Sequence, residues 1–279
     1  MALKLRPVEW VVGGYAMIVI PVAIARSAEW PDLRWVALAH LLILVLIGLL
    51  TRAGPGRLGE LLRDGAPLVL LLALYGALDA LNGHGARPTH DSTIQAVERA
   101  LFGGQPSRDW WRASPSGLWS TVFHAAYCAY YVVVPLPLVL TTWKRDLEAR
   151  RRATFAILTA FLACYLWFVF YPVAGPYYEF ARPDGDFVAN PAARLVYGVL
   201  GQASSYGAAF PSSHVAGTWA AVASVSIASW RWPLALIACA LTVGVVYCQM
   251  HYAVDAIAGL LVAAGAVVAA RAFAGAEAG

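Results

Sequence analysis

The chain has 279 residues, of which 60% are hydrophobic and only 13% are charged, with a net charge of +4. A soluble globular domain carries about 25% charged residues, so this composition excludes an ordinary soluble protein and indicates a polytopic membrane protein. The basic residues form no stripe on a polar domain, so we expect no nucleic-acid partner. The 4 cysteines lie in apolar runs without the spacing of a metal site or a disulfide framework.

Eight apolar runs follow one another along the chain, and each is close to the ~20 residues that a membrane-spanning helix needs. We predict spans over residues 10–25, 33–50, 66–81, 118–142, 153–171, 212–229, 233–250 and 251–270. The expected fold class is therefore all-α, a polytopic membrane helical bundle. Ala23-Ile24-Ala25 fits a signal-peptidase site, whereas Pro21 within a longer apolar run favours an uncleaved first span.

A polar insert between the third and fourth spans predicts one further helix. Asp91 and Ser92 are suited to cap a short helix over Thr93–Phe102 whose apolar residues share one face, as in helices that lie along a membrane surface. His84 and His90 fit a solvated loop better than a metal site. Asp79, near the end of a span, fits an interfacial cap better than a functional acid inside the membrane.

Two histidines begin the last apolar hairpin, His214 in Phe-Pro-Ser-Ser-His and His251 in His-Tyr-Ala-Val-Asp. If both runs cross the bilayer, the two histidines lie on the same side at the same depth. Ser212 suits a helix N-cap and Pro211 a first turn, and helix N-termini bind anions. His251 and Asp255 are four residues apart, hence on one helical face, where a carboxylate can take the Nδ1 proton and free Nε2 as a nucleophile. Two interfacial histidines and a polar cap are the alternative interpretation.

These motifs resemble the second and third signatures of the type-2 phosphatidic acid phosphatase superfamily. The stretches Tyr171–Pro176, Leu101–Gly103 and Ala126–Tyr131 are similar to its inositol-phosphorylceramide-synthase-like (inositolphosphotransferase) branch. The resemblance covers roughly Tyr75 to Val268 and implies a six-helix phosphatase-type core. We therefore assign residues 1–65 to N-terminal spans and residues 66–272 to a phosphatase/phosphotransferase-like membrane domain, with no separate soluble domain.

Two cations of the superfamily's signatures are missing. The first signature ends at Arg182-Pro183, but its lysine position holds Gly175, and the arginine expected six residues before His251 is Val245. Arg182 is our candidate for binding phosphate, since a guanidinium can hold two phosphate oxygens, and Arg194 is the second choice. A plain surface arginine is the alternative.

Resemblance and residue chemistry together imply an integral-membrane lipid phosphatase or phosphotransferase. His251 would attack phosphorus and form a phosphohistidine, Asp255 would hold the His251 tautomer, and His214 would protonate the leaving oxygen. Ser212 and Ser213 would stabilise the equatorial oxygens. We expect no metal and no cofactor, a membrane lipid substrate, and water or a polyol such as inositol as acceptor. The alternative is a non-catalytic membrane transport or scaffold protein.

The basic residues also predict an orientation. Most of them lie in the terminal segments and in every second connection between the predicted spans. These residues are Lys4, Arg6, Arg52, Arg57, Arg63, Lys144, Arg145, Arg150, Arg151, Arg152, Arg231 and Arg271. The positive-inside rule places these segments and both termini in the cytoplasm. The histidines would then lie at the outer face of the plasma (inner) membrane.

Overall fold

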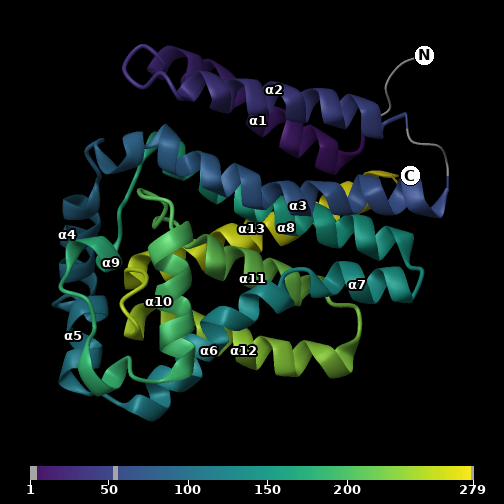
Figure 1. Ribbon diagram of the computed structural model, residues 1–279. Coiled ribbons are helices and arrows are strands. Elements are labelled where there is room, and N and C mark those ends of the chain that lie inside the picture. The colour runs from purple at the N-terminus through teal and green to yellow at the C-terminus, as the bar shows by residue number, and fades with distance from the viewer. Residues whose placement is uncertain (1–4, 53–55, 278–279) are drawn as a thin grey trace.

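A computed structural model describes residues 5–52 and 56–277, and in these ranges the chain forms helices and connecting segments (Figure 1). The described part contains no β-strand, only an isolated bridge between Val173 and Ala208, so the predicted all-α class is confirmed. Six described helices are long and apolar enough to cross a membrane, which confirms a polytopic membrane bundle. They are α1 (Pro7–Arg26), α2 (Leu33–Leu50), α3 (Arg57–Leu81), α8 (Leu147–Phe170), α12 (Ala228–Tyr247) and α13 (Ala253–Glu277).

The predicted span over residues 118–142 is a bent pair of helices. It consists of α6 (Gly117–Val133) and α7 (Leu136–Trp143), whose axes differ by 42°. Pro135 lies at the break and Pro137 in the first turn of α7, and proline cannot supply the backbone N–H of a continuous helix. The pair counts as a seventh candidate span in the described part of the chain.

The helix expected over residues 212–229 is shorter than predicted. α11 (Ser213–Ser224) has 12 residues, about 18 Å of helix against a hydrocarbon core of about 30 Å. It packs between α8 and α13, and a Cβ on its Gly217 would lie 2.2 Å from the Phe161 ring of α8. Its apolar residues therefore face other helices, and extended residues 225–227 complete the passage to α12.

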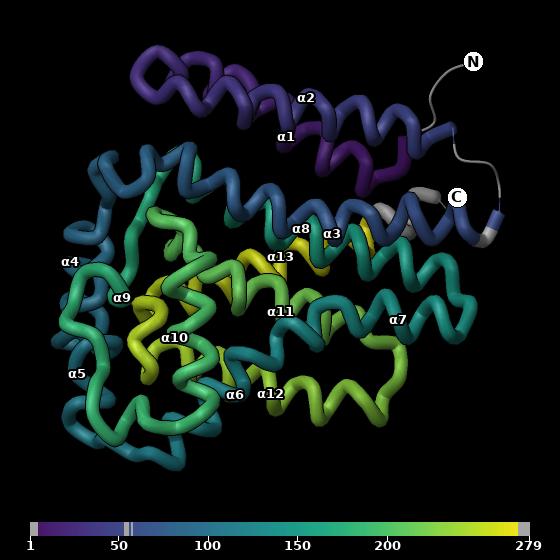
Figure 2. The backbone as a smooth tube through the Cα atoms, in the orientation of Figure 1, coloured from purple at the N-terminus to yellow at the C-terminus, as the bar shows by residue number. Residues whose placement is uncertain are grey.

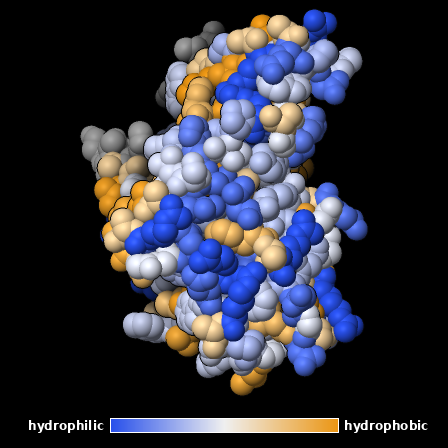
Figure 3. All heavy atoms as spheres, turned by 90° about the vertical axis from the view of Figure 1, so that its left-hand side faces the viewer, coloured by the Kyte–Doolittle hydropathy of each residue, from blue (hydrophilic) through white to orange (hydrophobic). Residues whose placement is uncertain are grey.

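Short helices cover one end of the bundle, where α8 ends and α11 and α13 begin (Figures 1 and 2). They are η1 (Gly83–Gly85), α4 (Asp91–Phe102), α5 (Pro106–Ala113), α9 (Pro176–Glu179), η2 (Gly185–Phe187) and α10 (Pro191–Ala203). Seen from this end, the surface is mainly hydrophilic, with apolar residues scattered within it and at its edges (Figure 3). α1 begins and α13 ends at the opposite end (Figure 1).

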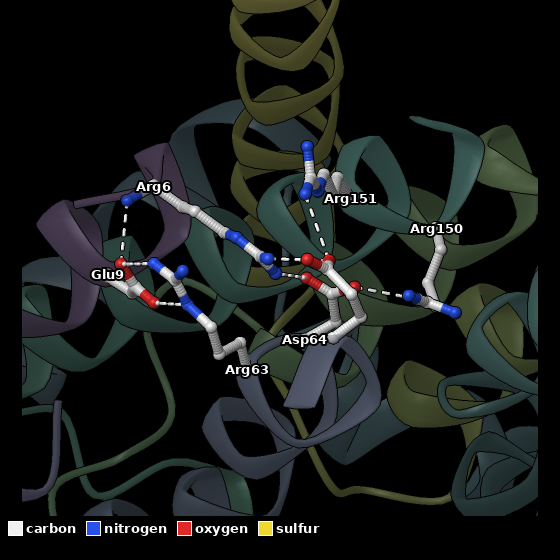
Figure 4. A network of polar contacts seen from close by, with 7 residues as sticks. Arg6, Glu9, Arg63, Asp64, Arg150 and Arg151 are labelled. Atoms are coloured by element: carbon white, nitrogen blue, oxygen red, sulfur yellow. Dashed lines mark hydrogen bonds and ion pairs between the residues drawn. The ribbon is translucent and has the colours of Figure 1, made fainter. Parts of the chain in front are cut away.

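A network of ion pairs closes that opposite end and joins α1, α3 and α8 (Figure 4). The fully buried carboxylate of Asp64 accepts from Arg6 Nη1 at 2.8 Å and from Arg150 Nε at 2.7 Å. Further pairs link Arg6 and Arg151 to Glu60, and Arg63 to Glu9. α3 runs through the boundary that we placed between residues 65 and 66, and the division into residues 1–65 and 66–272 stays a prediction.

Candidate functional site

The two predicted histidines meet at the covered end of the bundle. His214 lies in the first turn of α11, and His251 lies two residues before α13. Nε2 of His251 is 3.4 Å from Nδ1 of His214. Gly259 allows α13 to approach the start of α11, because a Cβ there would lie 2.6 Å from the carbonyl oxygen of Ser212.

The carboxylate of Asp255 lies next to the His251 ring, on its Nδ1 side. Its Oδ2 is 3.3 Å from Nδ1 of His251 and accepts the backbone N–H of Tyr252 at 2.9 Å. Its backbone carbonyl accepts the N–H of Ser212 at 3.0 Å, which ties the two sequence motifs together. Asp255 is fully buried, so its carboxylate serves this turn and no solvent-facing partner.

The serines begin α11. Ser212 is the N-cap, and its Oγ accepts the backbone N–H of Val215 at 3.4 Å. Pro211 precedes the cap and does not lie in the first turn as expected. Within the described part of the chain, the backbone N–H groups of Ser213 and His214 make no hydrogen bond. The start of α11 therefore offers two free donors next to the histidine pair.

Both histidines line a small, partly open cavity of about 40 Å³. Hydroxyl-bearing side chains dominate the rest of its wall: Tyr75, Tyr127, Tyr177, Tyr178, Ser204 and Ser205. Small and apolar residues complete it: Ala174, Leu200, Ala208, Ala209 and Met250. This wall includes no Lys, Arg, Asp or Glu side chain, so a ligand inside the cavity meets hydroxyl and imidazole groups.

Arg182 is exposed and does not line the cavity, but it stacks on the wall residue Tyr177. Its guanidinium carbon is 4.2 Å from the centre of the Tyr177 ring. The preceding carbonyl of Ala181 accepts from Arg112 Nη2 at 2.6 Å and from Gln249 Nε2 at 3.0 Å, which fixes the loop that carries Arg182. Arg194, the second candidate, is an exposed residue of α10.

The structure explains both missing cations. Gly175 has φ +92°, and a Cβ there would lie 2.8 Å from that of Ala209, so a lysine would require a different backbone. Val245 is fully buried in an apolar cluster, and its carbonyl accepts the N–H groups of Met250 and His251. A charged side chain at position 245 would have to replace this packing.

Two acids of α4 hold the site, and the sequence analysis assigned neither to it. Asp91 was expected to cap its own helix, but its oxygens accept the N–H groups of Ala174 and Gly175, both at 2.8 Å. The hydroxyl of Tyr252 also donates to Asp91, at 2.9 Å. The carboxylate therefore fixes the cavity wall relative to the turn that follows His251.

Glu98 is fully buried and caps α13, since its Oε1 accepts the N–H groups of Ala253 and Val254. Burial raises the pKa of Glu98 to about 7, against the opposing effect of these two donors. Its Oε2 has no hydrogen-bond partner in the described part of the chain. The sequence signal for Glu98 was its spacing, four residues after Ile94 and seven after Asp91 on one helical face.

The polar residues of the third span and the following loop lie outside the cavity wall. Asp79 accepts from His84 Nδ1 at 2.7 Å and from the backbone N–H of Tyr206 at 3.2 Å. The His90 ring stacks on Tyr171 with centroids 3.9 Å apart. Across the described residues, no group of three or more His, Cys, Asp or Glu side chains could hold a metal ion.

The fold and the site together define a class of protein: an integral membrane helical bundle with an aspartate-supported histidine pair at one end. The sequence profile of the PAP2 superfamily matches residues 92–269, so the chain belongs to this superfamily. The match runs from α4 into α13 and includes both histidine motifs. Members of the superfamily are generally phosphatases, and membership suggests a phosphatase or phosphotransferase of lipid phosphates. No curated protein and no solved structure matches the chain.

Proposed function

We propose that this protein is a lipid phosphatase or phosphotransferase that transfers a phosphoryl group through a phosphohistidine at His251. The observation that carries the proposal is the row formed by Asp255, His251 and His214, with separations of 3.3 Å and 3.4 Å. Superfamily membership supports a lipid phosphate as the substrate.

His251 is the nucleophile in this proposal. Its Nδ1 proton is donated to Asp255, so the lone pair on Nε2 is available at the cavity wall. Nε2 attacks phosphorus while the bond from phosphorus to the leaving oxygen breaks. His214, protonated for this step, gives its Nδ1 proton to that oxygen. The substrate must part the two rings, whose centroids are 5.6 Å apart.

The equatorial phosphoryl oxygens are stabilised by donors already in place. The free backbone N–H groups of Ser213 and His214 point from the start of α11, where the helix dipole favours an anion. Ser212 contributes indirectly, since its hydroxyl caps the helix. Arg182, stacked on Tyr177, is the nearby cation that would complete charge neutralisation.

The second half of the reaction transfers the phosphoryl group to an alcohol or to water. The tyrosine and serine hydroxyls of the wall, including the pair Tyr178 Oη to Ser204 Oγ at 2.9 Å, are suited to a polyhydroxylated acceptor. We therefore keep inositol or another polyol as the acceptor beside water, as in the inositolphosphotransferase-like branch. The proposed chemistry uses no metal and no cofactor, so turnover is expected to survive a chelator such as EDTA.

The test is an assay of the purified protein in detergent with a panel of lipid phosphates, with and without inositol or glycerol. We expect phosphate release or acceptor-dependent transfer with at least one substrate, and a loss of about 10²-fold or more in His214→Ala. His251→Ala is expected to be inactive. His84→Ala, which changes an exposed histidine away from the cavity, is the matched control and should keep wild-type rates. Near-normal turnover in both cavity variants would refute the site.

A further inference from the structure

The phenol of Tyr127 lies on the far side of the His214 ring from His251. Tyr127 belongs to α6, is buried, and lines the cavity. Its hydroxyl is 3.0 Å from Nε2 of His214, and the two ring centroids are 4.7 Å apart. Within the described part of the chain, the Tyr127 hydroxyl makes no other hydrogen bond.

These contacts form a chain of hydrogen bonds whose direction follows from donor and acceptor chemistry. An ionised Asp255 can only accept, so Nδ1 of His251 donates to it and Nε2 of the neutral ring accepts. The donor to that Nε2 is then Nδ1 of His214. Nε2 of His214 is left as an acceptor, and the Tyr127 hydroxyl donates to it.

The reversed chain of hydrogen bonds is disfavoured, because it leaves the Tyr127 hydroxyl proton without an acceptor. If Nε2 of His214 carried the proton in this resting arrangement, the Tyr127 oxygen would accept it. The phenolic proton would then have no protein acceptor in the described part of the chain. A buried donor without an acceptor costs free energy.

We propose that Tyr127 is a positioning residue that occupies Nε2 of His214 and so makes Nδ1 the nitrogen that exchanges protons with the reacting groups. This inference rests on the proposed function, in which His214 is the acid and base of the reaction. Without Tyr127, either nitrogen of His214 could carry the single proton of the neutral ring. Only Nδ1 faces His251, where phosphorus must lie.

The hydroxyl suits both protonation states of His214, because it can donate or accept. When His214 is an imidazolium, Nε2–H donates to the Tyr127 oxygen. Nδ1 then gives its proton to the leaving oxygen as the nitrogen–phosphorus bond forms, and His214 becomes neutral with its remaining proton on Nε2. In the second half, the Nδ1 lone pair takes a proton from water or the alcohol, which restores the imidazolium.

Several other side chains contact the His214 ring, and a control must separate the effect of the Tyr127 hydroxyl from theirs. Tyr127 and Tyr130 of α6 both pack against the ring, and His251 faces it from the start of α13 with Asp255 behind it. Tyr130 meets the His214 ring edge-on, with centroids 4.6 Å apart, and its hydroxyl makes no bond to His214. Tyr130→Phe is therefore a matched control for Tyr127→Phe.

The experiment compares kcat, KM and the pH profile of kcat for wild type, Tyr127→Phe and Tyr130→Phe. We expect Tyr127→Phe to lower kcat by about 10- to 100-fold with little change in KM, less than the loss of a complete acid–base group. Because the hydroxyl donates to neutral His214 and accepts from the imidazolium, its removal changes the balance between the two forms and should shift the alkaline fall of kcat. Tyr130→Phe should match wild type in both respects.

A second readout does not depend on turnover. The histidine ¹⁵N spectrum of labelled protein in detergent reports which ring nitrogen carries the proton, and the His214 signals are those missing in His214→Ala. We expect these signals to change in Tyr127→Phe and to stay unchanged in Tyr130→Phe. Unchanged His214 signals, or a Tyr127→Phe enzyme with wild-type kcat and pH profile, would overturn the inference. If wild type turns over no lipid phosphate, the proposed function fails, and the spectrum still decides the role of Tyr127.

Discussion

Arg182 is the cation on which the proposed site depends most. The positions of two other expected cations are filled by Gly175, whose backbone excludes a side chain, and by Val245, which is core. The start of α11 supplies only about half a unit of positive charge. We therefore expect Arg182→Ala to lower kcat/KM nearly as much as His214→Ala does. Arg182→Lys, which keeps the charge but loses the planar fork, should recover part of the activity.

The measurement is kcat/KM for the three variants and wild type on one lipid phosphate. Arg34→Ala is the control, since Arg34 is an exposed arginine of α2 and does not line the cavity. An Arg182→Ala variant within about threefold of wild type, about 0.7 kcal/mol of transition-state stabilisation, would remove Arg182 from the site. Arg194 or another cation would then have to neutralise the phosphate.

Residues joined by short-range spacing were predictable, and residues joined only by the fold were not. His251 and Asp255 are four apart, so helical periodicity places them on one face without a structure. Asp91 and Tyr252 are separated by 161 positions, and no periodicity connects them. Tyr127 lay in a stretch noted for its resemblance, but its partner His214 is 87 positions away.

At the scale of single elements, Glu98 makes the start of α13 sensitive to pH. Its pKa is about 7 in the folded protein, above the ordinary 4.5, chiefly because burial disfavours the carboxylate. A raised pKa means that its contribution to stability is fully present below about pH 4.5 and is lost as pH rises toward 7. Glu98→Gln removes this titration, so stability should depend less on pH between 4.5 and 7 than in wild type.

Thermal unfolding in detergent at several pH values measures the effect. One titrating group contributes a slope of at most about 1.4 kcal/mol per pH unit. Glu179→Gln, which removes a less buried acid on the same side of the molecule, is the comparison. Parallel pH curves for wild type and Glu98→Gln would show that Glu98 does not titrate in this window.

The elements themselves were largely predictable, because long apolar runs and polar breaks define most membrane helices. One exception is α11, where the apolar run predicted a span over residues 212–229 and the helix ends at Ser224. An apolar pattern does not distinguish residues that face lipid from residues that face other helices. Gly217 and Phe161 are in direct contact, and this packing is visible only in the fold.

At the scale of the whole molecule, the ion-pair network around Asp64 holds α1, α3 and α8 together. Removing one partner of a buried ion pair costs about 3–5 kcal/mol, because the other charges stay buried. We expect Asp64→Asn to destabilise the protein by an amount in this range in detergent unfolding. Glu148→Gln, at an exposed pair with Arg152, should change stability by less than about 1 kcal/mol. If Asp64→Asn destabilised the protein no more than Glu148→Gln does, the network would not contribute to stability.

The same network marks the end of the molecule that we place in the cytoplasm. Glu148 lies at this end, whereas Asp184 lies in the exposed loop on the side of the histidines. We expect a membrane-impermeant maleimide added to intact cells to label Asp184→Cys and not Glu148→Cys, with the wild type and its native cysteines as the blank. The reverse pattern would invert the proposed topology.

The central claim is that His251 becomes covalently phosphorylated during turnover. The most direct measurement is to mix the enzyme with a ³²P-labelled lipid phosphate, quench in alkaline detergent, which preserves phosphohistidine, and map the label by peptide mass spectrometry. We predict label on the peptide that contains His251 in wild type, none in His251→Ala, and loss of the label when water or a polyol acceptor completes the reaction. Turnover without label on His251, or label on another residue, would contradict the account.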